Sequence, residues 1–224
     1  MRPNDPAQPA DDGYDFEISG GHAALNLANT ISRREAPGES RDDLTHYGRL
    51  VSWAVQAELL APKEGERLRA AARERPRAAV AALRRAIAIR EAIFSLFVAI
   101  ARGEKPQAAA LDSVNAALPE ALAALRVGPA PDGFAWRFTR DEAELAPMLA
   151  PVVRAAAELL TSGDRTRIRE CGSDTCFWLF LDRSKNGTRR WCDMKVCGNR
   201  AKARRHYERE KKAMRPQRRR RVSS

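Results

Sequence analysis

The feature that most constrains the fold of this chain is a cluster of four cysteines within 27 of its 224 residues. Their spacing is Cys171-x4-Cys176-x15-Cys192-x4-Cys197, two close pairs joined by a longer segment. Tight turns that hold such pairs aim four thiolates at one ion, which is typical of tetrahedral zinc. Because four cysteines close the coordination shell, we predict one structural Zn²⁺ and not a catalytic one. Free buried thiols or two disulfides are the alternatives.

The segment around these cysteines is predicted to be a small module. Apolar and aromatic side chains beside the ligands would form its core; they are Phe177, Trp178, Leu179, Phe180 and Trp191. Residues 182–187, DRSKNG, predict the tip of a hairpin between the two cysteine pairs. Four thiolates on Zn²⁺ leave a charge of about −2. We therefore expect Arg190, Lys195 and backbone N–H groups to offset it.

A strongly basic segment follows the last cysteine. Residues 161–224 hold 20 Lys+Arg and 7 Asp+Glu, a net charge of +13, while the whole chain has +11. We predict a helix capped by Asn199, with one apolar face packed on the zinc module: Val196, Ala203, Tyr207 and Met214. The other faces carry cations, which are Arg200, Lys202, Arg204, Arg205, Arg209, Lys211 and Lys212. This density predicts nucleic-acid binding through phosphates; a solvated helix without a partner, an acidic protein or a membrane are alternatives.

The rest of the chain is rich in Ala, Leu and Arg, a mixture that favours helix. Apolar spacing predicts helices at 22–31, 43–60, 64–75, 77–102, 107–125 and 141–161, the second capped by Asp42 or Asp43. The fifth is expected to be interrupted at Pro119, and the sixth to be split or to start near Pro147–Pro151. Alternating residues at 14–18 and 133–139 predict two short strands that pair with each other.

The expected fold class is therefore mainly α. Residues 14–162 form a helical domain with a minor two-stranded β element, and residues 165–214 form a small treble-clef-like zinc finger of hairpin and helix, held by the four cysteines. The Pro- and Asp-rich residues 1–13 and the basic tail 215–224 are expected to be disordered.

Polar residues flank the first predicted helix and could line a small-molecule pocket: His22, Asn29, Thr30 and Arg34. Alternatively, Asn29 and Thr30 satisfy backbone groups and His22 is a cap or surface residue. No constellation of catalytic residues is recognisable, so an enzyme is not expected. The N-terminus lacks an apolar h-region, and no stretch of about 18 apolar residues occurs, so we expect a cytoplasmic protein without a membrane partner.

The cysteine segment resembles the CGNR zinc-finger family. The match runs from Cys171 to Cys176 and on through FWLFLDRSKNGTRRWCDMKVCGNRAKARRHYER, with CGNRAKARRH at 197–206 closest to the family signature. In that family the GNR residues are proposed to contact DNA. The resemblance therefore implies that Gly198, Asn199 and Arg200 do so here.

The N-terminal part resembles the ABATE domain of stress-induced transcription regulators, which is usually fused to this finger. The matching residues are GGHAALNLANT at 20–30 and the stretch 47–60 around Trp53. A frequent family pattern has Asp where Asn26 stands, so the resemblance carries over no role of that carboxylate to this chain. The resemblance implies a bacterial transcription regulator.

The function expected from these observations is a zinc-dependent DNA-binding regulator. Its helical domain would sense a small-molecule effector or form a homodimer. An RNA- or ribosome-associated zinc protein is the alternative, since the same basic finger would serve there.

Overall fold

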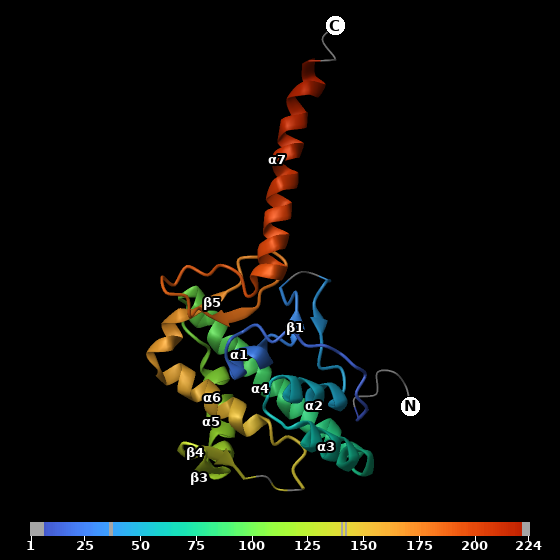
Figure 1. The fold of residues 1–224 in the computed structure, drawn as a ribbon, viewed down its shortest axis with the longest axis vertical. Helices are drawn as coiled ribbons and strands as arrows, with labels where there is room; N and C mark the ends of the chain where they lie inside the picture. The colour runs from blue at the N-terminus through green and yellow to red at the C-terminus, as the bar shows by residue number, and fades with distance from the viewer. Residues whose placement is uncertain (1–6, 36–37, 140, 142, 221–224) are drawn as a thin grey trace.

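The computed structural model describes residues 7–35, 38–139, 141 and 143–220, and shows mostly helix with three two-stranded sheets (Figure 1). The helices are α1 (Ala23–Ala28), α2 (Tyr47–Gln56), α3 (Pro62–Glu74), α4 (Pro76–Arg102), α5 (Ala108–Ala123), α6 (Leu149–Thr161) and α7 (Asn199–Arg220). The strands are β1 (Ile31–Ser32), β2 (Arg41–Asp42), β3 (Leu125–Ala130), β4 (Gly133–Phe138), β5 (Ile168–Glu170) and β6 (Leu179–Leu181). The predicted fold class is confirmed. Within the described residues, no helix has the length and apolar character needed to cross a bilayer.

Helix α4 is the centre of the helical body, and α1, α2, α3, α5 and α6 all pack against it. In its 27 residues, apolar side chains recur every three or four positions, which places them on one buried face. They are Ala79, Ala82, Leu83, Ala86, Ile89, Ile93, Leu96 and Phe97. Burying one Leu or Phe side chain contributes about 1.5–3 kcal/mol, so this face holds the surrounding helices together.

Helix α2 contributes the largest aromatic side chains of the same core. Trp53 is fully buried, and the buried Tyr47 hydroxyl donates to the Leu145 carbonyl at 2.7 Å. The predicted cap was wrong: α2 begins at Tyr47, so neither Asp42 nor Asp43 lies at its N-terminus. The Asp42 carboxylate is instead engaged by an arginine of α4.

That arginine, Arg90, is 1% exposed and ties α4 to β2. It donates to both carboxylate oxygens of Asp42 at 2.7 Å each and to Glu91 at 2.9 Å. A buried guanidinium must be paired in this way, because leaving its charge unpaired costs several kcal/mol. Burial acts to raise the pKa of Asp42, but the hydrogen bonds from Arg90 lower it overall.

Residues 7–13 follow an ordered path along α2, contrary to the expected disorder. Gly48 N–H donates to the Gln8 carbonyl at 2.8 Å, and a Cβ at Gly48 would overlap the backbone of Ala10. The aspartates that suggested disorder have basic partners on α2 and α3: Asp12 accepts from Arg49 at 2.8 Å, and Asp11 from Arg69 at 2.8 Å. Residues 1–6 of the same prediction lie outside the described residues.

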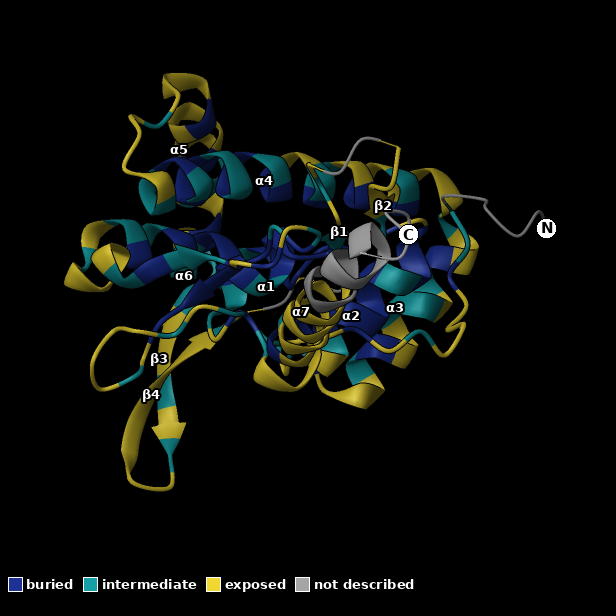
Figure 2. Cartoon of the chain, turned by 90° about the horizontal axis from the view of Figure 1, so that it is seen from above, coloured by how far each residue is buried: buried dark blue, intermediate teal, exposed yellow. Residues whose placement is uncertain are grey.

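Strands β3 and β4 form a hairpin that projects from the helical body (Figure 2). The strand predicted at 133–139 is confirmed as β4, but its predicted partner was wrong: residues 14–18 form no strand, and β4 pairs with β3. Pairing across the short turn at 131–132 closes a far smaller loop than pairing with 14–18, and therefore loses less chain entropy. Pro129 within β3 made that strand hard to recognise in the sequence.

Candidate metal centre and nucleic-acid interface

Strands β5 and β6 form the hairpin that positions the first cysteine pair. The pairing places Ile168 opposite Leu181 and Glu170 opposite Leu179, so Cys171 and Cys176 lie in the connecting loop. Cys171 N–H donates to the Trp178 carbonyl at 2.8 Å, which closes this loop. The predicted hairpin between the two cysteine pairs was wrong, since residues 182–187 form a turn that follows β6. The turn residues predicted a turn correctly, but no strand lies between this turn and the π-helical turn at Met194, a stretch that the structure describes in full.

The β5–β6 hairpin is fixed to the helical body. Ile168, Leu179 and Leu181 belong to the same buried cluster as α1 and α4. The Asn29 side chain donates to the Leu179 carbonyl at 2.8 Å and accepts from Leu179 N–H at 2.9 Å. Trp178 Nε1–H donates to the Ile31 carbonyl at 2.9 Å. The finger and the helical body therefore share one core at this hairpin.

Cys192 precedes a π-helical turn, Met194–Gly198, that contains Cys197 and runs directly into α7. Asp193 begins the turn, and its carboxylate accepts from Val196 N–H at 2.9 Å. Asn199 is consequently inside the helical path and is not the predicted cap. Gly198 is buried, and a Cβ there would require the Met194 side chain to move.

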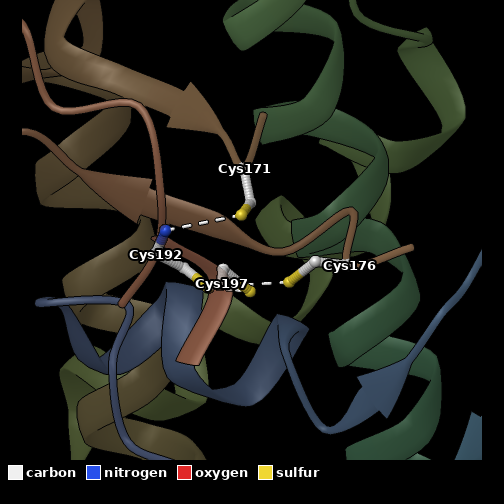
Figure 3. A group of neighbouring side chains, drawn as sticks. All are labelled: Cys171, Cys176, Cys192 and Cys197. Atoms are coloured by element: carbon white, nitrogen blue, oxygen red, sulfur yellow. Dashed lines mark hydrogen bonds between the residues drawn. The ribbon is translucent and has the colours of Figure 1, made fainter. Parts of the chain in front are cut away.

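The four cysteine side chains point toward one another from these two turns (Figure 3). All four are buried, and their sulfurs lie within 4.8 Å of one another. The Cys176–Cys192 and Cys192–Cys197 sulfur separations are 3.5 and 3.7 Å. Four sulfurs at about 2.3 Å from a Zn²⁺ would be about 3.8 Å apart in a tetrahedron. The cysteines therefore fit a tetrahedral metal ion of that size.

Crowding of the four sulfurs makes a cation necessary if all are to be thiolates. Hydrogen bonds from Cys176 and its neighbours lower the pKa of Cys171, whereas the hydrogen bonds with Cys171 raise the pKa of Cys176 and of Cys192. Cys192 N–H donates to the Cys171 sulfur at 3.5 Å. This is one of the backbone N–H groups expected to offset the negative charge of the thiolates. A bound divalent ion would allow all four to ionise and would release protons as it binds.

The cation that braces this centre is Arg189, which the sequence reasoning missed. Its guanidinium lies 4.5 Å from the Phe180 ring centroid and donates to the Trp191 carbonyl at 2.8 Å and to the Cys192 carbonyl. The predicted Arg190 instead stacks on the Trp191 ring at 5.5 Å, and the side chain of Lys195 is exposed. The two consecutive arginines before Trp191 indicated that a cation lies near the cysteines, but the sequence alone does not determine which of the two faces inward.

Helix α7 stands away from the body as a single helix (Figure 1). Its described side chains end at residue 211, and the predicted packing of its apolar face on the zinc module was wrong: Val196 is 41% and Tyr207 65% exposed, and Ala203 is exposed. The side chain of Met214 lies outside the described residues. The helical backbone continues to Arg220, where disorder from residue 215 was expected; residues 221–224 are not described.

The predicted DNA-contact residues lie on this helix or at its start. Exposed side chains belong to Asn199, Arg200, Lys202, Arg204, Arg205 and Arg209, whereas Gly198 is buried. Arg204 forms ion pairs with Asp174 and, at 3.1 Å, with Glu208. Arg200 donates to the Thr175 hydroxyl at 3.3 Å. The structure brings these cations together on one helix that emerges from the cysteine site.

The four predicted pocket residues do not converge on a common space. Asn29 holds Leu179, and the Thr30 hydroxyl donates to the Leu27 carbonyl at 2.8 Å. Arg34 pairs with Glu91 and lies 4.0 Å from the Phe94 ring centroid. His22 directly precedes α1 and its side chain makes no capping hydrogen bond, and burial lowers its pKa. None of the four lines the cavity of about 400 Å³ beside the cysteine site.

A neighbouring residue of the same motif has a clear local role. The Asn26 side chain accepts from Gly20 N–H at 2.8 Å. An amide oxygen therefore accepts the hydrogen bond of this backbone N–H at the position where the family pattern often has a carboxylate.

A helical body whose core extends into a four-cysteine finger defines a protein of the zinc-finger class. Comparison with family models gives two matches: ABATE, described as "Putative stress-induced transcription regulator", over residues 21–163, and the CGNR zinc finger over residues 167–210. The chain belongs to the ABATE family, with a CGNR zinc finger at its C-terminal end. This is the domain architecture predicted from the sequence. No curated protein matches the chain.

Proposed function

We propose that this protein is a DNA-binding transcription regulator whose finger holds one structural Zn²⁺. The observation that carries the proposal is α7, a helix of 22 residues that starts two residues after Cys197 and leaves the body without a packing partner among the described residues. A helix of this composition has no apolar face to pack against the body, and packing of such a face is what stabilises most helices in proteins. Its exposed faces are therefore available to a partner.

The dimensions of α7 suit the major groove of DNA. At about 1.5 Å per residue, 22 residues extend about 33 Å, and a helix with its side chains is about 10–12 Å across. The major groove of B-DNA is about 12 Å wide and admits one α-helix.

The charge of α7 suits phosphate. Its described side chains include six exposed cations against two acidic residues, Glu208 and Glu210; the cations are Arg200, Lys202, Arg204, Arg205, Arg209 and Lys211. Cations on several faces reach the phosphates on both sides of a groove, and one or two of them can reach base edges. Arg200, nearest the finger, is the residue we assign to base reading.

Zinc in this proposal orients α7. The first cysteine pair belongs to a hairpin that is locked to Asn29, and the second pair lies at the start of α7. One ion bound to all four thiolates would fix the helix relative to the body. A shell closed by four cysteines has no open position for a substrate, so we propose a binding protein and not an enzyme. The family description supports a role in transcription under stress.

Fluorescence anisotropy of the full-length, metal-loaded protein tests the proposal. Duplex DNA and a structured RNA hairpin of equal length are titrated between about 50 and 200 mM salt, and with about five phosphate contacts the slope of log K against log salt should be about −4 to −5 on DNA. Substituting Arg205 and Arg209 together by Ala should weaken binding and reduce the slope by about 2.

Arg73→Ala, an exposed arginine of α3, is the matched control and should change neither quantity. Tighter binding to the RNA hairpin than to DNA would contradict the proposal and favour an RNA-associated protein. The stoichiometry of the DNA complex, measured in the same titration, shows whether the protein binds as a monomer or as a dimer.

A further inference from the structure

A cavity of about 400 Å³ lies where the helical body meets the finger. Residues beside β1 and β2 form one side of it, and the cysteine turns with the first residues of α7 form the other. Its volume falls within the range of about 300–1,000 Å³ that small-molecule sites occupy. Of the residues that line it, only Arg200 belongs to the proposed DNA contacts.

Most of the charged side chains around this cavity neutralise one another. Arg33 pairs with Glu39, and Arg41 pairs with Asp43 at 3.0 Å. Two charged side chains of the lining form no ion pair within the described part of the chain, Glu17 and Arg200. Burial and the nearby Asp193 raise the pKa of Glu17, and the charge of Arg200 acts to lower it, so the two side chains are close enough to influence each other. They lie on opposite sides of the junction, one on the body and one on α7.

This charge pattern selects the class of ligand. A simple anion would be attracted by Arg200 but repelled by Glu17 and by the cysteine sulfurs of the lining, which carry negative charge when they hold a metal ion. A simple cation would be attracted by Glu17 but repelled by the arginines. A molecule with one positive and one negative group satisfies both unpaired side chains.

The apolar part of the lining narrows the class further. Trp178 and Val196 both face the cavity, and Val196 is 41% exposed, so an apolar group placed there would remove this surface from water. We propose that the cavity binds a free α-amino acid with a large apolar side chain. Its carboxylate pairs with Arg200, its ammonium group pairs with Glu17, and its side chain packs on Trp178 and Val196.

Such a ligand would control the proposed function, and this part of the inference depends on that function. A carboxylate paired with Arg200 occupies the guanidinium that otherwise meets DNA. The amino acid and DNA therefore compete, and the ligand-bound protein binds DNA more weakly.

Thermal unfolding of the full-length, metal-loaded protein without DNA tests the site directly. The probes are L-leucine, L-phenylalanine and L-tryptophan at about 10 mM, each compared with its C-terminal amide and its N-acetyl derivative. At about 100 times the dissociation constant, a ligand should raise the Tm by about 5–10 °C. We expect this from at least one free amino acid and not from the derivatives, because the amide lacks the carboxylate and the N-acetyl form lacks the ammonium group.

Glu17→Gln provides the matching variant. Since Glu17 makes no hydrogen bond within the described residues, the variant should fold normally, and it should bind the active amino acid at least about tenfold more weakly. Glu66→Gln, at an exposed carboxylate of α3, is the control and should bind like the unaltered protein.

Three results would overturn the site: no Tm rise with any of the three amino acids, equal rises with their derivatives, or unchanged binding by Glu17→Gln. DNA affinity is measured separately, with and without the amino acid. Failure to bind DNA in either condition would contradict the proposed function while leaving the result on the amino-acid site intact.

Discussion

The two halves of the cysteine site have very different surroundings. Cys171 and Cys176 lie on a hairpin whose side chains belong to the main core and whose backbone is held by Asn29. Cys192 and Cys197 lie on a short turn that continues into α7, whose described side chains are almost all exposed. The first half is thus part of the helical body. The second half is connected to it through the cluster of sulfurs and through a few hydrogen bonds, among them Gly172 N–H to the Arg190 carbonyl at 2.8 Å and Arg189 to the Ser19 carbonyl at 3.4 Å.

This difference indicates that the two halves are stabilised by different interactions. The first half is stabilised by burial of apolar surface that exists with or without a metal ion. The second half has few apolar contacts, so its order depends on the ion and on the hydrogen bonds of Asp193 and Arg189. Substitutions in the two halves and in the elements next to them test this division, beginning with the largest expected effect.

Loss of the metal should separate the two halves. Cys192→Ser removes one ligand from a site whose apparent binding free energy is typically about 10–16 kcal/mol. We expect elemental analysis to show little bound zinc and DNA affinity to fall more than about 100-fold. The circular dichroism of the body helices should persist, because their core does not include Cys192.

Limited proteolysis of the same variant sharpens this comparison. Cleavage should begin between residues 183 and 211, while residues 168–181 remain protected by the core. Equal susceptibility of both segments, or tight DNA binding by a metal-free protein, would show that the halves are not divided as described.

Breaking the anchor of the first half should destabilise the whole body. Asn29→Ala removes both hydrogen bonds to the backbone of Leu179 and leaves a buried N–H and carbonyl with fewer partners. We expect a loss of about 2–4 kcal/mol in the free energy of unfolding, measured with urea. Asn115→Ala, at an exposed position of α5, should cost less than about 0.5 kcal/mol. A similar small loss for Asn29→Ala would mean that the hairpin is not anchored to the core.

Acid should weaken the body through Asp42. Since the pKa of Asp42 is lowered in the folded protein, its pairing with Arg90 stabilises the fold above its ordinary pKa of about 3.9, and this contribution is lost as the pH falls through the lowered value. Asp42→Asn should remove about 1–2 kcal/mol at pH 7, because the carboxylate is partly exposed, and less at pH 3. Glu208→Gln on α7 should leave both values unchanged. Equal losses at the two pH values for Asp42→Asn would exclude this linkage.

Single cations of α7 should affect binding without affecting folding. Lys202→Ala should change the free energy of unfolding by less than about 0.5 kcal/mol, since its side chain is exposed. It should reduce the salt slope of DNA binding by about 1, similarly on specific and random sequences. A destabilised Lys202→Ala protein would show that α7 packs on the body after all.

Arg200→Ala gives the contrast to Lys202. If Arg200 contacts a base edge, its substitution should reduce the binding free energy by about 1–3 kcal/mol more on the specific site than on random DNA. Equal losses on both would make Arg200 a phosphate contact.

The sequence predicted the cysteine site and the basic helix because both are local. Four thiols spaced over 27 residues can meet on two tight turns whatever the rest of the chain does, and the cations that follow Cys197 are consecutive along one helix. The body helices were predictable for the same reason, since their apolar residues recur with the period of a helix. The two matching families agree with this architecture.

Only the tertiary structure decided how these parts connect. Asn29 and Leu179 are 150 positions apart, and no local pattern links them. The same holds for Asp11 with Arg69, for Asp42 with Arg90, and for the cavity that Glu17 and Arg200 share. Periodicity and spacing report on neighbours along the chain. Contacts between distant segments depend on how the whole core packs, because each buried polar group takes whichever partner that packing brings within reach.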